Sequence, residues 1–188
     1  SMLTRQLQYA LTLCEPLAEG KKKSIHEIRR TFKKNRALLR LLRDVMGFSA
    51  YCFENYAMRD MHRLLSSARD GDVFLDLLKK LPRCYPWIKG EAWFSATRNE
   101  ALLRIERDRQ ALTERGIPDQ IRAGTSQCLN RLDHMELERE GYALLKKGMK
   151  RTYRQARDTL NHAFLAGSEA KVLHEFRKRM KYLQYQQQ

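Results

Sequence analysis

The sequence predicts an all-α protein in which two related helical bundles share a pseudo-two-fold axis. Apolar residues recur at helical spacing along nearly the whole chain, and strand-like alternation is scarce. Only 4 prolines and 9 glycines interrupt the 188 residues, and one short basic motif occurs twice. A chain of this length is large enough for one compact domain or for two small helical bundles.

Eight helices follow from the apolar periodicity and from the glycines and prolines that punctuate it. The predicted helices span residues 2–19, 23–46, 49–67, 70–81, 88–115, 118–138, 140–164 and 169–187. Their expected ends coincide with Gly20, Gly47, Gly116 and Gly167, and Pro118 suits a first helical turn.

Aromatic residues gather near the start of the helix predicted at 88–115. Pro82 and Pro86 bracket an expected loop, and Trp87, Trp93 and Phe94 follow it. These aromatics are not interleaved with the basic residues described below, which weakens their interpretation as a platform for stacked nucleic-acid bases. We therefore expect them to anchor the core between the two units.

The basic motif that occurs twice defines an internal repeat. The two copies match at four positions, offset by 148 residues: His26, Glu27, Arg29 and Lys33, then His174, Glu175, Arg177 and Lys181. A helix precedes each copy, whereas two helices follow the first copy only. We expect one domain over 1–188, with a first repeat at about 2–138 and a second, incomplete repeat at about 140–188.

The charge balance predicts an anionic partner. The chain has 37 Lys and Arg against 22 Asp and Glu, a formal net charge of +15. Such a surplus costs self-repulsion in a compact state unless an anion supplies the opposite charge. Composition alone leaves nucleic acid, anionic lipid, acidic protein and inorganic phosphate polymers open.

Cysteine usage and hydropathy predict a cytoplasmic protein without a membrane partner. The four cysteines are widely separated, and no pair has the spacing of a zinc or redox motif. No signal-peptide pattern is present, and no apolar run approaches the roughly 20 residues that span a bilayer. No cofactor or metal is expected, since phosphate-binding glycine loops and the His-Glu-x-x-His motif are missing from the sequence.

One long helix carries a continuous basic stripe. Residues 21–43 contain ten Lys or Arg and a single acid, Glu27. Residues that recur every three or four positions share one face of a helix, and the basic ones here are Lys22, His26, Arg29, Lys33, Arg36, Arg40 and Arg43. A 21-residue run at the helical rise is about 32 Å long, with roughly one cationic head per turn.

The second repeat adds two further stripes at the same spacing. One contains His174, Arg177 and Lys181, and the helix before it contributes Lys147, Lys150, Arg154 and Arg157. We expect the three stripes to face one another across the pseudo-two-fold axis.

The basic stripe of the first repeat lies beside its apolar stripe rather than opposite it. The apolar residues are Ile25, Ile28, Phe32, Leu39, Leu42 and Met46, and a turn of about 100° per residue separates the stripe centres by roughly a quarter to a third of a turn. This placement favours the wall of a groove or channel. The alternatives are a basic face exposed to water and, for His26 and His174, neutral imidazoles bonded in the core.

The paired motifs resemble the CHAD family, the conserved-histidine α-helical domain. The resemblance rests on His26-x-x-Arg29-x-x-x-Lys33-x-x-Arg36, on residues 68–73 (Ala-Arg-Asp-Gly-Asp-Val), on residues 153–157 (Tyr-Arg-Gln-Ala-Arg) and on the second His motif. It covers essentially the whole chain. It implies two four-helix bundles around a basic central channel that binds inorganic polyphosphate without catalysis, with phosphate or sulfate as occupants of the same site. It also implies an association with polyphosphate granules.

By position, the resemblance implies a defined set of ligand residues: His26, Arg29, Lys33, Arg36, His174, Arg177 and Lys181, with Arg154 in support. Together with the stripe residues Arg40, Lys147, Lys150 and Arg157, these form the predicted site, and Lys22, Arg69 and Asp70 are expected to support it. Gln184 replaces the counterpart of Arg36 in the second copy, so the site should be asymmetric.

Two other functions compete with polyphosphate binding. A nucleic-acid-binding helical protein would use the same basic faces, although no specific nucleic acid is expected. A metal-dependent polyphosphate hydrolase would use Asp70 and Asp72 as a metal-binding pair. We expect these two carboxylates instead to cap the N-terminus of the helix at 70–81 and to pair with nearby cations.

Overall fold

A computed structural model of the chain describes residues 1–135, 142–165 and 169–187. These residues form helices and no strand, which confirms the predicted all-α class. The elements are α1 (Met2–Thr12), α2 (Cys14–Ala18), α3 (Lys22–Met46), α4 (Phe48–Leu64), α5 (Ser66–Cys84), the 3-10 helix η1 (Pro86–Gly90), α6 (Ala92–Glu114), α7 (Ile117–Asp133), α8 (Tyr142–Leu165) and α9 (Ala170–Gln186).

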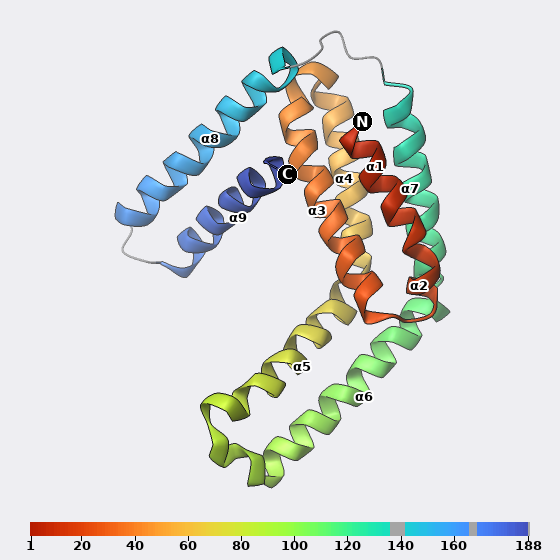
Figure 1. Ribbon diagram of the computed structural model, residues 1–188, viewed down its shortest axis with the longest axis vertical. Helices are drawn as coiled ribbons and strands as arrows, with labels where there is room; N and C mark the ends of the chain where they lie inside the picture. Colours follow the sequence, from red (N-terminus) through yellow and green to blue (C-terminus); the bar gives the residue numbers. More distant parts are fainter. Residues whose placement is uncertain (136–141, 166–168, 188) are drawn as a thin grey trace.

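The helices form a central bundle from which two helical hairpins project (Figure 1). The bundle contains α1, α2, α3, α4 and α7, which pack on one another. The α5–α6 hairpin extends from one end of the bundle, and the α8–α9 hairpin leaves it nearer the other end, on the same side of the view. The long helix α3 contacts both hairpins and therefore runs between their bases. The pseudo-two-fold relation between the repeats stays a prediction.

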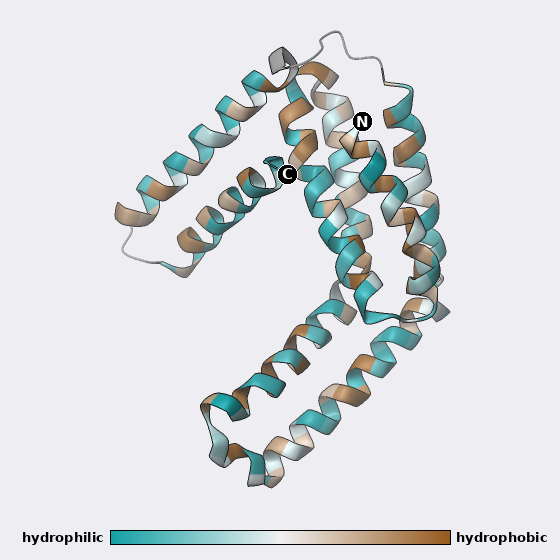
Figure 2. Cartoon of the chain, in the orientation of Figure 1, coloured by the Kyte–Doolittle hydropathy of each residue, from teal (hydrophilic) through white to brown (hydrophobic). Residues whose placement is uncertain are grey.

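The apolar stripe of α3 forms the centre of the bundle core. Ile25, Ile28, Phe32 and Leu39 are fully buried, together with residues of α1, α4 and α7. Burial of each such side chain contributes about 1.5–3 kcal/mol. The hydropathy colouring of Figure 2 shows polar and apolar residues mixed along every helix, as expected for amphipathic helices. No helix in the described part of the chain is both long enough and apolar enough to cross a membrane.

Several helix boundaries differ from the predicted ones. The first predicted helix is divided at Leu13, which ends α1 and precedes α2. Pro16 fits the first turn of α2 because a backbone donor is not needed there. α5 begins at Ser66 and continues through Pro82 to Cys84, so the loop expected from Pro82 onward is shorter than predicted. Gly167 and residues 136–141, at predicted helix ends, lie outside the described residues.

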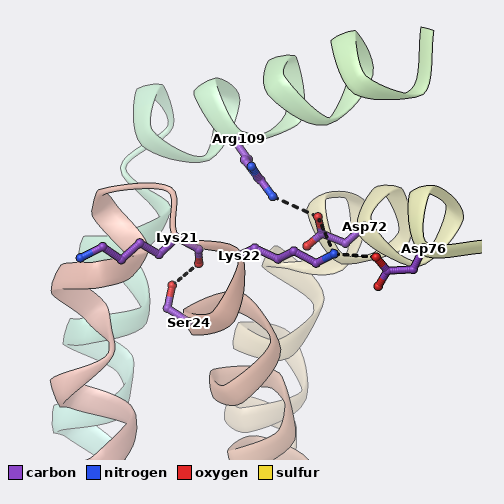
Figure 3. A network of polar contacts seen from close by, with 6 residues as sticks. All are labelled: Lys21, Lys22, Ser24, Asp72, Asp76 and Arg109. Carbon is purple, nitrogen blue, oxygen red and sulfur yellow. Dashed lines mark hydrogen bonds and ion pairs between the residues drawn. The ribbon is translucent and has the colours of Figure 1, made fainter. Parts of the chain in front are cut away.

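The early start of α5 corrects the role predicted for Asp70 and Asp72. Both lie inside the helix rather than at its N-terminus. Asp72 is only 1% exposed, and its Oδ1 lies 3.0 Å from Arg109 Nη2 and 3.9 Å from Lys22 Nζ (Figure 3). Asp70 is exposed, and residues two apart in a helix do not share a face. The two carboxylates therefore do not form a common metal-binding pair.

The aromatic cluster is buried only in part. Phe94 is 6% exposed and packs with Leu78, Ile88 and Ala101 in a small core of the α5–α6 hairpin. Trp87 and Trp93 are 66% and 52% exposed, so the expectation that they anchor a core was wrong. The small core of the hairpin is formed instead by Leu78, Ile88, Phe94 and Ala101, with Leu81 packed against them.

The α8–α9 hairpin is held against α3 by contacts to the main chain of α3. Gly148 of α8 is buried against the main chain of Leu41, and a Cβ at this position would collide with the Leu41 carbonyl. Arg151, one turn later, bonds to the Asp44 carboxylate and to the Arg40 carbonyl. From α9, Gln186 Nε2 donates to the Ala37 carbonyl at 2.8 Å. These contacts fix where α9 lies relative to α3.

We predict that Gly148→Ala weakens the fold, because the added methyl group forces α8 away from the rigid backbone of Leu41. The expected loss in the free energy of unfolding is about 1–3 kcal/mol, despite the better helix propensity of alanine. Urea unfolding measures it.

The matched control is Gly90→Ala, where nothing lies within 4 Å of an added Cβ. This change should alter the stability by less than about 0.5 kcal/mol. Equal stability of the two variants would contradict the close approach of α8 to α3.

Candidate functional site

A basic pocket of about 380 Å³ opens between α3 and α9. Five of its lining residues are Lys or Arg, one is a histidine and two are tyrosines. The lining residues are Lys33, Arg36, His174, Arg177, Lys178, Lys181, Tyr182 and Tyr185. No acidic residue is among these described lining residues. The two basic motifs, far apart in the sequence, thus contribute cations to one cavity.

The pocket face of α9 is set by which of its sides packs on α8. Val172, Phe176 and Leu183 are half-buried, and these positions share one helical face. His174 and Lys181 lie on the opposite face and are exposed. Because α9 also contacts α3, this polar face meets the basic stripe of α3 at Lys33 and Arg36.

Arg36 is positioned by a hydrogen bond that leaves part of its guanidinium available. Its Nε donates to Asn55 Oδ1 of α4 at 3.0 Å, and within the described residues its terminal nitrogens have no hydrogen-bond partner. Burial lowers the pKa of Arg36, and the neighbouring Arg40 lowers it further, while Tyr182 acts in the opposite direction. A phosphate oxygen at the pocket could accept from these terminal nitrogens.

Lys33 experiences the same uncompensated positive charge. Loss of hydration lowers its pKa first, and Arg29, Arg69 and Arg36 lower it further, with Asp70 as a partial counter-charge. Like charges held together near a protein surface repel by several kcal/mol per close pair. An anion bound here would relieve that repulsion.

A half-buried histidine indicates how positive this part of the molecule is. His62 of α4 has its pKa lowered to about 3, chiefly by burial and then by Arg29, Lys33 and Arg36 of α3 and by Arg63 of its own helix. Its Nε2 is buried and lacks a hydrogen-bond partner within the described chain. The imidazole is therefore neutral at ordinary pH, because protonation would add another cation to the cluster.

Two predicted ligand residues hold helices together. Arg29 Nη1 donates to the His62 carbonyl and to Ser66 Oγ, both at 2.9 Å, across the junction of α4 and α5. Arg40 donates to Tyr51 Oη at 3.0 Å and to Tyr182 Oη at 3.2 Å, and its guanidinium carbon lies 4.2 Å from the Tyr182 ring centroid. Both arginines border the pocket residues and position the elements that carry them.

The N-terminal part of the α3 stripe does not line the pocket. Lys22 Nζ lies 2.9 Å from Asp76 Oδ1 and is also near Asp72, so carboxylates of α5 compensate its charge (Figure 3). His26 is exposed and is not among the lining residues. The two motif histidines consequently do not open onto this one cavity, since only His174 borders it.

The stripe predicted on α8 lies apart from the pocket. Its four cations are exposed and none lines the cavity between α3 and α9: Lys147, Lys150, Arg154 and Arg157. The buried face of α8 is formed by Gly148, Thr152 and Ala156, so the basic stripe occupies the opposite face. Of the three stripes expected to face one another, two converge here.

The sequence argument missed three pocket residues, Lys178, Tyr182 and Tyr185. Tyr185 lies four residues after Lys181, so extending the stripe by one turn would have found it. Lys178 follows Arg177 directly and pairs with Glu175 at 3.0 Å. The sequence gives no signal for Tyr182, because its position in the pocket depends on its contact with Arg40 of α3, which is far from it in the sequence.

Comparison with known protein families identifies the class of this helical fold. The family model described as CHAD domain matches residues 1–188, the whole chain. The chain therefore belongs to the CHAD domain family. No curated protein and no solved structure matched it in the other two comparisons.

We predict that His62→Gln makes the stability of the protein less sensitive to acid. The folded state lowers the pKa of His62 from 6.5 to about 3, so the unfolded chain binds the proton more readily. The contribution of the neutral imidazole is complete above pH 6.5 and is lost as the pH falls toward 3.

Urea unfolding at pH 7.5 and pH 4.5 measures this contribution. Wild type should lose about 1–2 kcal/mol more than the variant between the two values. The hydrogen bond from Arg29 to the main-chain carbonyl of residue 62 is retained in the variant. Equal losses of unfolding free energy in wild type and variant would therefore show that His62 is not held neutral by its neighbours.

Proposed function

We propose that the protein binds inorganic polyphosphate in the pocket between α3 and α9, without catalysing a reaction on it. The observation that carries the proposal is the meeting of Lys33 and Arg36 with the basic face of α9 in a cavity whose described lining contains no acid. Polyphosphate binding is the property for which the CHAD family is known. Localisation to the cytoplasm and to polyphosphate granules stays an expectation of that family membership.

The chemistry of the lining suits a chain of phosphoryl groups. Arg36 and Arg177 can each donate two parallel hydrogen bonds to phosphoryl oxygens, whereas Lys33 and Lys181 act as mobile point charges. A linear polyanion releases condensed counterions when such cations replace them, so affinity should decrease steeply with salt. The exposed stripe on α8 and the exposed His26 of α3 offer further contacts to a polymer that extends beyond the pocket.

The alternatives predicted from the sequence have less support in this geometry. Hydrolysis would need a metal or a general acid and base near the phosphate, and Asp72 is instead buried in ion pairs with Arg109 and Lys22. Among the described residues, no group of three His, Cys, Asp or Glu is arranged to hold a metal ion. A pocket bounded by two helices also fits a thin single chain of phosphates better than a rigid duplex.

We predict that Arg177→Gln combined with Lys181→Gln weakens polyphosphate binding by about tenfold or more, which corresponds to ~1.4 kcal/mol. Both residues line the pocket from exposed positions on α9, so the helical content should not change. Fluorescence anisotropy with end-labelled polyphosphate, measured over a range of salt concentrations, gives the affinity and the salt slope.

The control removes two exposed positive charges elsewhere, through Lys23→Gln with Lys171→Gln, neither of which lines the pocket. It should retain the affinity within about twofold and thereby separate local contacts from net charge. Equal losses of affinity in both variants would show that binding depends on net charge and not on the pocket residues. Displacement of polyphosphate by duplex DNA at equal phosphate concentration would favour the nucleic-acid alternative.

A further inference from the structure

A second basic pocket lies at the far end of the α5–α6 hairpin, away from α9. It has a volume of about 720 Å³ and is bordered by both helices and η1. Four of its lining residues are cationic: Lys79 and Arg83 of α5, Lys89 of η1 and Arg98 of α6. The predicted polyphosphate site includes none of them.

The positive charge of this pocket is compensated only in part within the described structure, where the Asp76 carboxylate interacts at longer range with Lys79. Its lining contains no acidic residue, and none of the four cations forms an ion pair among residues 1–135, 142–165 and 169–187. All four side chains are exposed, but they come from three elements that border one cavity. Holding them around one cavity favours an anion within it.

The floor and the wall of the pocket are well defined. Leu78 and Phe94, which belong to the small hairpin core, are 5% and 6% exposed and line its base. Ser95 and Asn99 add neutral hydrogen-bonding groups on α6. Ser95 lies in the first turn of this 23-residue helix, where the positive end of the helix dipole adds to the favourable potential.

From this cluster we infer that the tip of the α5–α6 hairpin binds a compact diphosphate or triphosphate group. Four converging cations match the charge of such a group, and the volume leaves space for the molecule that carries it. The group belongs either to a free phosphate compound or to a phosphate headgroup on a lipid surface. The inference does not rest on the proposed function, because the two pockets share no lining residue.

The protein contains a reporter specific to this pocket. Its two tryptophans, Trp87 and Trp93, both lie at this tip and are more than half exposed. Trp93 stands edge-on to the pocket residue Phe94, with ring centroids 5.8 Å apart. Tryptophan fluorescence therefore reports on the hairpin tip and not on the pocket between α3 and α9.

The experiment titrates the full chain with inorganic pyrophosphate at constant ionic strength and follows tryptophan fluorescence, with isothermal titration calorimetry in parallel. We expect saturable binding in wild type and at least tenfold weaker binding in Arg83→Gln with Arg98→Gln. Lys80→Gln with Arg107→Gln, which removes two exposed charges of the same helices outside the pocket, should bind as wild type does. Circular dichroism verifies that each variant is folded.

Two further experiments test whether the fluorescence change comes from this pocket and which kind of phosphate compound binds there. Arg177→Gln with Lys181→Gln should retain the fluorescence response, and its loss there would overturn the inference. Binding equal to that of sulfate, or no binding that depends on Arg83 and Arg98 by either method, would overturn it as well. Cosedimentation with phosphatidylcholine vesicles containing diacylglycerol pyrophosphate, lost in Arg83→Gln with Arg98→Gln, identifies a lipid headgroup as the source, whereas pyrophosphate binding alone identifies a free phosphate compound.

Discussion

The contact of the α8–α9 hairpin with α3 determines whether the basic residues of the two motifs meet. Gly148 lets α8 approach the main chain of Leu41, and Gln186 connects the end of α9 to the Ala37 carbonyl. Arg40 adds a bridge from α3 to Tyr182. Without this contact, Lys33 and Lys181 would belong to two separate basic surfaces, each with weak attraction for an anion in water.

The cations of α3 divide into two groups according to their partners. Arg29 and Arg40 bond to groups of neighbouring helices, Arg29 to a carbonyl and a hydroxyl and Arg40 to two tyrosine hydroxyls and one tyrosine ring. Lys33 and the terminal nitrogens of Arg36 have no such partner among the described residues. Burial lowers the pKa of both, as it does for Arg29, and neighbouring cations lower it further. The first group fixes the geometry, whereas the charge of the second group is not balanced by a partner within the described residues. Under the proposed function, a bound anion would supply that balance.

The all-α class and the amphipathic character of α3 could be predicted because helical periodicity depends only on local spacing. The buried stripe of Ile25, Ile28 and Phe32 follows directly from it. The meeting of the two motifs was predicted from the internal repeat and the spacing of the basic stripes, and the resemblance to a family supported that prediction. Roles that depend on distant helices escaped the sequence argument: Arg40 needs Tyr182 as its partner, and Asp72 needs Arg109.

The same limitation explains the stripe on α8 and the exposed tryptophans. Spacing places Lys150 and Arg154 on one face of a helix, but only the packing of Gly148 and Thr152 against α3 decides that this face turns outward. For Trp87, hydrophobicity predicted burial, whereas the two-helix hairpin buries the neighbouring Ile88 and leaves Trp87 exposed.

The most direct test of the central claim is a two-dimensional NMR titration of the isotopically labelled protein with short-chain polyphosphate. If one anion is held between α3 and α9, backbone signals around Lys33 and Arg36 should shift together with those around His174 and Lys181, along one saturation curve. Shifts confined to one of the two helices, or curves with clearly different midpoints, would show that the pocket does not act as a single binding site.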